Sequence, residues 1–245
     1  MRIKKKTLII LFLLPTLMIF GQDTTYYDYE WNKVSSIKLA SYYKIVLLEQ
    51  ADTNTAIETV YFKSGQIKSH KEYSNYNDKK LDGKLNEWYE NGQIRKDIDF
   101  KYGKKSGKLL TYWNNGNPKR IDVYENDKLI EGKCINSDGI EAIHYDYEKM
   151  AEFPGGINEF MQYVAKETKY PNKSRKKGIE GRVLVGFMVN KNGTISDIKI
   201  VQSVNKELDE EAIRVVRNMP KWEPGMEDGE AVGVSINLPI SFVLN

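Results

Sequence analysis

A segment of about ten residues recurs in the middle of this 245-residue chain, and it restricts the fold more than any other feature. Residues 83–92 and 107–116 both begin with Gly-Lys-Leu, contain two adjacent aromatic residues and end in Asn-Gly, so equivalent positions lie 24 residues apart. Weaker copies occupy residues 56–65 and 132–139. A period of about 20–50 residues is typical of repeat architectures, in which each unit buries its apolar face against its neighbours.

Each copy has the pattern of a strand, a tight turn and a second strand. The paired aromatic residues suit a half-buried pleated surface. The dipeptides Asn91-Gly92, Asn115-Gly116 and Asp138-Gly139 tolerate positive φ at both positions, which predicts type I′ hairpin turns. We therefore expect an all-β hairpin array over residues 55–142, with the tyrosine-rich residues 22–54 forming strands that cap it.

On the Gly-Lys-apolar start, the aromatic pair and the Asn-Gly turn, residues 55–142 resemble the bacterial variant of MORN repeats, whose members include antitoxin-like proteins. The resemblance implies a surface that binds a protein or a headgroup. The alternative is a scaffold whose aromatic residues only pack, and the regular positions of these residues favour it.

The first residues have the pattern of an export signal. Lys4, Lys5 and Lys6 precede an apolar run over residues 7–20, which ends at Gly21. The run is shorter than the ~20 apolar residues of a spanning helix and contains Pro15, so we expect a signal peptide over residues 1–21, cleaved near Gly21-Gln22, rather than an inner-membrane anchor. This predicts the periplasm or cell envelope of a Gram-negative bacterium.

The charge balance argues against nucleic acid as a partner. The formal charge is +3, but residues 1–21 carry four basic side chains and no acidic one, so the remainder sums to −1. From this distribution we expect no basic patch beyond the first few residues and no binding of nucleic acid.

After a linker at residues 143–152, the pattern changes to mixed helix and strand. Ile157, Phe160, Met161 and Val164 form an apolar stripe on a short helix, and Pro171 follows its end. Strands are expected at residues 182–190 and 194–201, joined by a turn, and a second helix at 206–219. The last strand, residues 232–242, alternates apolar and polar residues, and Pro239 places it at a sheet edge. We expect an α+β fold overall: the hairpin array, then a small antiparallel sheet with two helices over residues 153–245.

Several motifs in this last region closely resemble the C-terminal domain of TonB. They are Phe153-Pro154-Gly155-Gly156, Tyr170-Pro171, residues 178–183, Asn192-Gly193, residues 208–212, residues 220–225 and residues 238–242. The resemblance implies a periplasmic domain that captures an extended peptide, the TonB box of an outer-membrane TonB-dependent receptor, by adding it to a sheet edge. Carried over by motif, the expected peptide-binding residues are Tyr170, Pro171, Val232, Val234, Ile236, Leu238 and Ile240.

Two other functions stay open. The chain could be an immunity, antitoxin-like or scaffold protein whose repeats bind an unidentified protein partner. It could also be a membrane-anchored energy transducer, although repeats stand where such a protein has a Pro-rich spacer. The oligomeric state is left open.

Catalysis is not expected. The sequence contains no GxSxG, P-loop or HExxH motif, and its two histidines, His70 and His144, lack the spacing of a metal site. Cys134 occupies a repeat position that is apolar in other copies. We therefore predict no catalytic residues, no cofactor and no metal.

Overall fold

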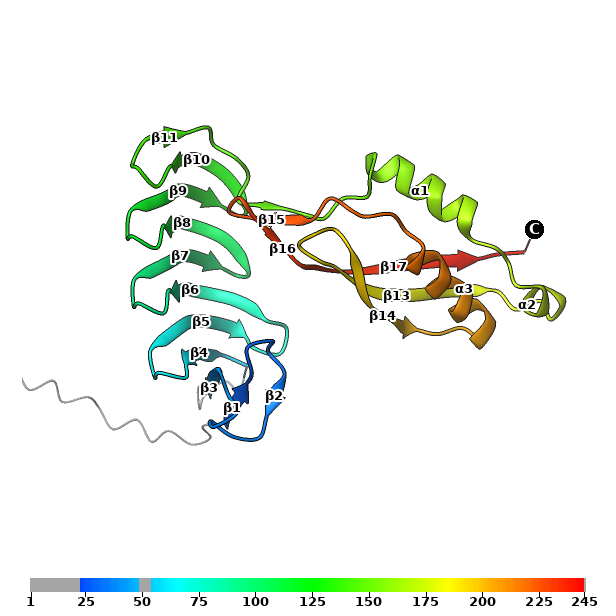
Figure 1. Ribbon diagram of the computed structural model, residues 1–245, viewed down its shortest axis with the longest axis horizontal. Helices are drawn as coiled ribbons and strands as arrows, with labels where there is room; N and C mark the ends of the chain where they lie inside the picture. The colour runs from blue at the N-terminus through cyan, green and yellow to red at the C-terminus, as the bar shows by residue number, and fades with distance from the viewer. Residues whose placement is uncertain (1–22, 49–53, 245) are drawn as a thin grey trace, which may run out of the picture. The chain divides into compact units, whose positions relative to one another are not determined.

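The computed structural model describes residues 23–48 and 54–244 and divides the chain into two compact units, residues 1–144 and 145–245 (Figure 1). The predicted signal peptide lies outside the described residues.

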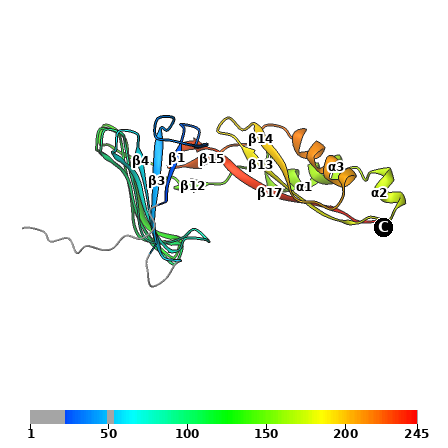
Figure 2. The same cartoon turned by 90° about the horizontal axis from the view of Figure 1, so that it is seen from below.

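The first unit is one antiparallel sheet of eleven strands. Its order is β11-β10-β9-β8-β7-β6-β5-β4-β3-β1-β2, so hairpins are added in chain order from β3 onward. The strands are β1 Asp23–Tyr27, β2 Lys33–Val34, β3 Tyr42–Leu48, β4 Ala56–Phe62, β5 Ile67–Asn75, β6 Lys80–Trp88, β7 Ile94–Lys101, β8 Lys104–Tyr112, β9 Pro118–Glu125, β10 Lys128–Ile135 and β11 Glu141–Ala142. Viewed along the stack, the strands overlie one another (Figure 2). The predicted hairpin array is therefore seen as a long sheet, and β1–β3 occupy its N-terminal end.

The predicted turn type at the repeat tips is wrong. Gly92, Gly116 and Gly139 have φ values of 85°, 86° and 89°, but Asn91, Asn115 and Asp138 are not among the residues with positive φ. The Gly92 N–H donates to the Tyr89 carbonyl and the Tyr89 N–H to the Gln93 carbonyl, both at 2.9 Å. This is a three-residue loop with glycine in the left-handed position, and it requires only one positive φ. Adjacent pairs with positive φ occur instead at Tyr102-Gly103 and Asn126-Asp127, at the opposite end of the hairpins.

The aromatic residues at the tips connect one repeat to the next. The Tyr89 hydroxyl donates to the Tyr112 carbonyl at 2.8 Å, and the Trp113 indole N–H donates to the Ile135 carbonyl at 3.0 Å. Equivalent side chains thus bond to the following hairpin, 23 and 22 residues later. These contacts support a structural role for the aromatic pairs.

One face of the sheet buries apolar residues together with an ion pair. Ile98 and Leu109 face each other across β7 and β8 and are 2% and 1% exposed. On β9, Arg120 and Asp122 are both fully buried, and the guanidinium Nη1 lies 2.8 Å from the Asp122 carboxylate. His144 Nε2 lies 2.9 Å from the other oxygen of the same carboxylate.

The second unit contains two three-stranded antiparallel sheets and three helices. The larger sheet has the order β14-β13-β17, from Ile195–Gln202, Gly181–Val189 and Val234–Phe242. The smaller has the order β12-β15-β16, from Glu148–Lys149, Gly225–Glu227 and Glu230–Val232. The helices are α1 Gly156–Glu167, α2 Asn172–Lys176 and α3 Lys206–Arg217.

The core of this unit is aromatic and aliphatic. Trp222 meets Phe153, Phe160 and Phe187 edge-on, with ring centroids 5.4–5.8 Å apart. Val183, Val185 and Val189 of β13 and Leu208, Val215 and Val216 of α3 are fully buried in the same cluster. The apolar side of α3 thus packs into this core, and Trp222 belongs to the same buried cluster.

Two details differ from the sequence prediction. Ile157 and Met161, expected to pack inward from the first helix, are 68% and 61% exposed, because the core-facing side of α1 centres on Phe160. The last strand is broken at Gly233: Val232 ends β16, where it pairs with Gly225, and β17 begins at Val234.

Candidate functional site

Strand β17 is one of the two edge strands of the larger sheet in the second unit. All nine residues of β17 pair with β13, and among the described strands β17 has no neighbour on its other side. Its burial alternates: Leu238, Ile240 and Phe242 are buried, whereas Ser235, Asn237, Pro239 and Ser241 are exposed. The predicted half-buried edge strand is thus observed.

Pro239 indicates which backbone groups point outward. A proline in an edge strand directs its nitrogen away from the sheet, because it has no N–H to donate to the ladder. Backbone direction in an antiparallel strand alternates with a period of two. We therefore expect Ser235, Asn237 and Ser241 to present their N–H and C=O groups at the free edge.

The predicted binding residues occupy three different settings. Val234, Ile236, Leu238 and Ile240 lie on β17 but direct their side chains toward the core, where Leu238 and Ile240 are 8% and 1% exposed. The groups of this strand at its free edge are therefore those of the backbone. Val232 belongs to the smaller sheet.

Tyr170 and Ile240 come together in one groove. The groove has a volume of about 220 Å³ and is lined by α1, the end of β17 and Tyr170. The Tyr170 hydroxyl donates to the Ile179 carbonyl at 2.6 Å, and its ring meets Phe242 edge-on at 5.7 Å. Burial and the Glu180 carboxylate raise the pKa of the Tyr170 phenol, so it stays a neutral donor near pH 7. These contacts hold the Tyr170 side chain in place along one side of the groove.

Pro171 lies elsewhere, at the start of α2, in a hollow shared with Lys169, Lys173 and Arg214. The α2 region reveals a charge feature that the whole-chain count missed. Five of the residues from 169 to 177 are basic and none is acidic, and all five basic side chains are exposed. The expectation of no local basic patch is therefore wrong here, although Glu207, Glu210 and Glu211 line the same hollow.

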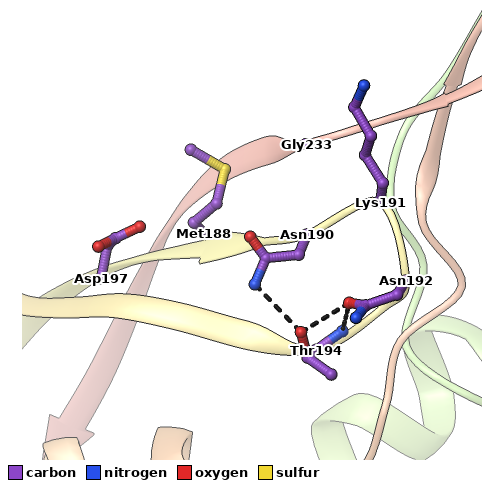
Figure 3. A pocket seen from close by; sticks show the side chains of 7 residues that line it. All are labelled: Met188, Asn190, Lys191, Asn192, Thr194, Asp197 and Gly233. Carbon is purple, nitrogen blue, oxygen red and sulfur yellow. Dashed lines mark hydrogen bonds between the residues drawn. The ribbon is translucent and has the colours of Figure 1, made fainter. Parts of the chain in front are cut away.

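A second hollow, at the β13–β14 turn, is lined by polar groups that form hydrogen bonds with one another. Figure 3 shows Asn190 donating to the Thr194 hydroxyl at 3.1 Å, while that hydroxyl and the Thr194 N–H both donate to Asn192 Oδ1. Gly193 of this turn abuts the backbone of Trp222, and the Trp222 N–H donates to its carbonyl at 2.9 Å. The polar groups satisfy one another, which marks a structural turn.

Among the described residues, no group of three or more His, Cys, Asp or Glu side chains could hold a metal ion. None of the helices in residues 23–48 and 54–244 has the length and apolarity to cross a membrane.

Comparison with known proteins gives a match in each of the two regions. Residues 166–244 match the family model described as Gram-negative bacterial TonB protein C-terminal, and residues 81–102 match the MORN repeat variant. Protein TonB of Helicobacter pylori strain 26695 is 31% identical over 102 residues, which is 40% of this chain and 34% of that protein. Protein TonB of Pseudomonas aeruginosa PAO1 is 37% identical over 65 residues, 26% of this chain and 18% of that protein. The chain thus spans about a third or less of the length of these relatives.

Among solved structures, the NMR solution structure of the Helicobacter pylori TonB-CTD is similar at 30% identity, covering 38% of this chain and 87% of that one with a TM-score of 0.29. The sequence relationship carries the assignment. Residues 166–244 match the TonB C-terminal family and residues 81–102 match the MORN repeat variant, as the motifs predicted.

Proposed function

We propose that this chain is an exported envelope protein whose second unit binds an extended peptide by adding it as a strand to β17. The unpaired nine-residue edge of β17 carries the proposal. In β-strand addition, backbone hydrogen bonds provide affinity and neighbouring side chains provide selectivity. The match to the TonB C-terminal family supports the TonB box of an outer-membrane TonB-dependent receptor as the peptide.

The edge is suited to this role because its exposed side chains are short. Ser235, Asn237 and Ser241 place no charged group along the strand. Natural proteins prevent unwanted strand pairing by placing charged side chains or proline on edge strands. Strand β17 has one such residue, Pro239, which limits the run of outward N–H donors on the C-terminal side of the strand.

The proposal is tested by substitution of one outward donor. Asn237→Pro removes an N–H expected to face the free edge, whereas Asn237→Ala keeps that N–H and changes only the side chain. With receptor-derived TonB-box peptides and the full chain, we expect Asn237→Pro to weaken binding at least about tenfold, the loss of one or more hydrogen bonds, and Asn237→Ala to bind nearly as the parent.

Two results separate this function from its alternatives. If no TonB-box peptide binds the parent chain while residues 23–144 retain a specific protein partner, the immunity or scaffold role of the repeats replaces it. Export is tested by sequencing the N-terminus of the mature protein: a chain that begins at Gln22 has lost its signal peptide, and one that keeps residues 1–21 fits the anchored transducer.

A further inference from the structure

The residues around α2 concentrate positive charge at one end of the second unit. Figures 1 and 2 show α2 at the end of this unit that is far from the smaller sheet. The segment 169–177 has five exposed basic side chains and no acidic one, and we call these five residues the basic tip: Lys169, Lys173, Arg175, Lys176 and Lys177. Residues 22–245 as a whole sum to −1, so the rest of them is net acidic. The positive charge is therefore local.

Helix α2 is fixed to the unit through one residue and exposes the others. Of its five residues, Ser174 alone is buried, with 1% of its surface exposed. The side-chain amide of Asn205, the residue that caps α3, donates to the Ser174 hydroxyl oxygen at 3.0 Å. The basic side chains on either side of Ser174 are thus held in one place, while their charged ends are exposed.

The fold does not neutralise the lysines of α2. Among residues 23–48 and 54–244, no ion pair includes Lys173, Lys176 or Lys177. Lys176 and Lys177 follow Lys173 by three and four residues, and like charges at these spacings destabilise a helix. The cluster therefore costs stability within the unit without gaining an internal partner, which points to a role outside it.

The nearest acidic side chains are largely engaged elsewhere. Glu211, which lines the hollow beside Pro171, is bound by the Arg214 guanidinium at 2.8 Å. Glu210 of the same hollow lies 3.9 Å from the Lys206 ammonium. Two of the three acidic residues of the hollow are thus paired with cations of α3, and the basic tip keeps a net positive charge.

We propose that the basic tip docks the second unit on an anionic phospholipid surface. Clusters of four to eight Lys and Arg are typical of binding to anionic lipid headgroups, and this attraction needs no pocket. The proposal goes beyond strand addition and does not depend on it.

The composition of the tip favours a bilayer over a protein partner. Four of its five residues are lysines, which are depleted at protein interfaces. The Arg175 guanidinium lies 5.5 Å from the centre of the Tyr170 ring, and that ring also packs against Phe242. Tyr170 is the single aromatic residue of the segment and is half-buried, so the tip lacks the exposed aromatic anchor on which protein interfaces depend.

The test measures co-sedimentation with lipid vesicles. Residues 22–245 are used, because they contain every described residue of both units and omit the basic and apolar first residues, which would bind vesicles by themselves. We expect binding to vesicles of about 30% phosphatidylglycerol in phosphatidylcholine at about 50 mM NaCl, and affinity at least about tenfold lower at about 500 mM NaCl, because salt screens the attraction. Vesicles of phosphatidylcholine alone should bind at least about tenfold more weakly.

Charge reversal locates the binding surface. Combining Lys173→Glu, Lys176→Glu and Lys177→Glu should weaken binding to the anionic vesicles at least about tenfold, and the same three changes to Gln should have an intermediate effect. The matched control changes the net charge equally and should stay within about threefold of the parent, since it reverses three exposed lysines elsewhere in the second unit: Lys191, Lys199 and Lys221. Thermal unfolding by circular dichroism verifies that the variants fold.

Three outcomes decide the proposal. An equal loss in both charge-reversed variants would assign vesicle binding to net charge and overturn the role of the basic tip. Retention of the parent on immobilised polyglutamate without binding to anionic vesicles would assign the tip to an acidic protein partner and overturn the bilayer. Asn237→Pro should bind vesicles as the parent does, so strand addition and membrane docking can fail independently.

Discussion

Gly107 and Gly139 of the repeat array both have positive φ, but only Gly107 lies against a neighbouring side chain. Gly107 has a φ of 123°, and a Cβ there would lie 2.6 Å from the Asp99 carboxylate. Gly139 has a φ of 89° but no atom within 4 Å of such a Cβ. We expect Gly139→Ala to cost about 1–2 kcal/mol of unfolding free energy from backbone strain, and Gly107→Ala to cost more because Asp99 must also move. Urea denaturation compares them; equal losses would contradict the steric role of Asp99.

Asp99 also predicts a dependence on pH. Burial alone would raise the pKa of its carboxyl, but the Lys84 ammonium at 2.7 Å and the Lys108 N–H at 2.8 Å outweigh it and hold the pKa below its usual value. A depressed carboxyl pKa contributes stability above the unfolded-state value of about 3.9, and that stability is lost as the pH falls through the folded-state pKa.

Asp99→Asn should therefore be less stable than the parent at pH 7, and the difference should shrink as the pH falls below about 4, toward the folded-state pKa of Asp99. Denaturant unfolding at pH 7, 5 and 3.5 measures the difference. If the difference in unfolding free energy between Asp99→Asn and the parent were the same at all three pH values, Asp99 would act through packing and not through its charge.

At the scale of elements, the sequence predicts periods better than it predicts faces and ends. The 24-residue spacing was enough to place the hairpins, because strand pairing has to repeat with it. The turn type was missed because Asn-Gly suits both a type I′ turn and a loop that needs only the glycine in the left-handed region. The alternation of apolar and polar residues predicts one continuous strand through Gly233, but at Gly233 the chain passes from the smaller sheet to the larger one.

Polar strand residues were the harder case for the site and the core alike. Arg120 and Asp122 share one face of β9 and were indistinguishable from a solvent-facing pair until the structure showed both fully buried. On α1 the apolar stripe is wider than the side of the helix that the core covers. The stripe therefore predicts buried positions for Ile157 and Met161, which are exposed. Periodicity shows which residues share a face, but whether that face is buried depends on what packs against it.

The repeat length makes a prediction for whole hairpins. Deleting residues 83–106 removes one 24-residue unit and joins Asp82 to Gly107, which keeps every later side chain on its original face. Deleting residues 83–105 shifts the register by one residue and reverses the faces of the strands that follow. We expect the 24-residue deletion to fold with strand content lower by one hairpin, and the 23-residue deletion to be degraded by trypsin far faster.

Circular dichroism and limited proteolysis measure both outcomes. Similar protection of the two deletion variants would show that the register is set elsewhere than in the repeat.

For the whole molecule, the two units have separate cores, and their stabilities should separate as well. Every member of the C-terminal core cluster lies between Phe153 and Phe242, whereas Ile98 and Leu109 belong to the array. Leu208 is fully buried in the former and Leu109 is 1% exposed in the latter. Truncating a buried leucine to alanine removes about 2–5 kcal/mol of unfolding free energy.

Leu208→Ala should therefore lower the unfolding temperature of residues 145–244 by at least about 10 °C and leave that of the array within about 2 °C of the parent, and Leu109→Ala should do the opposite. Hydrogen exchange measured by mass spectrometry at increasing temperature reads the two units separately, because each peptide fragment reports its own region. A shift of both units together by either substitution would show that they unfold as one cooperative body. With separate transitions, the proposed addition of a strand to β17 would stabilise the second unit without changing the stability of the array.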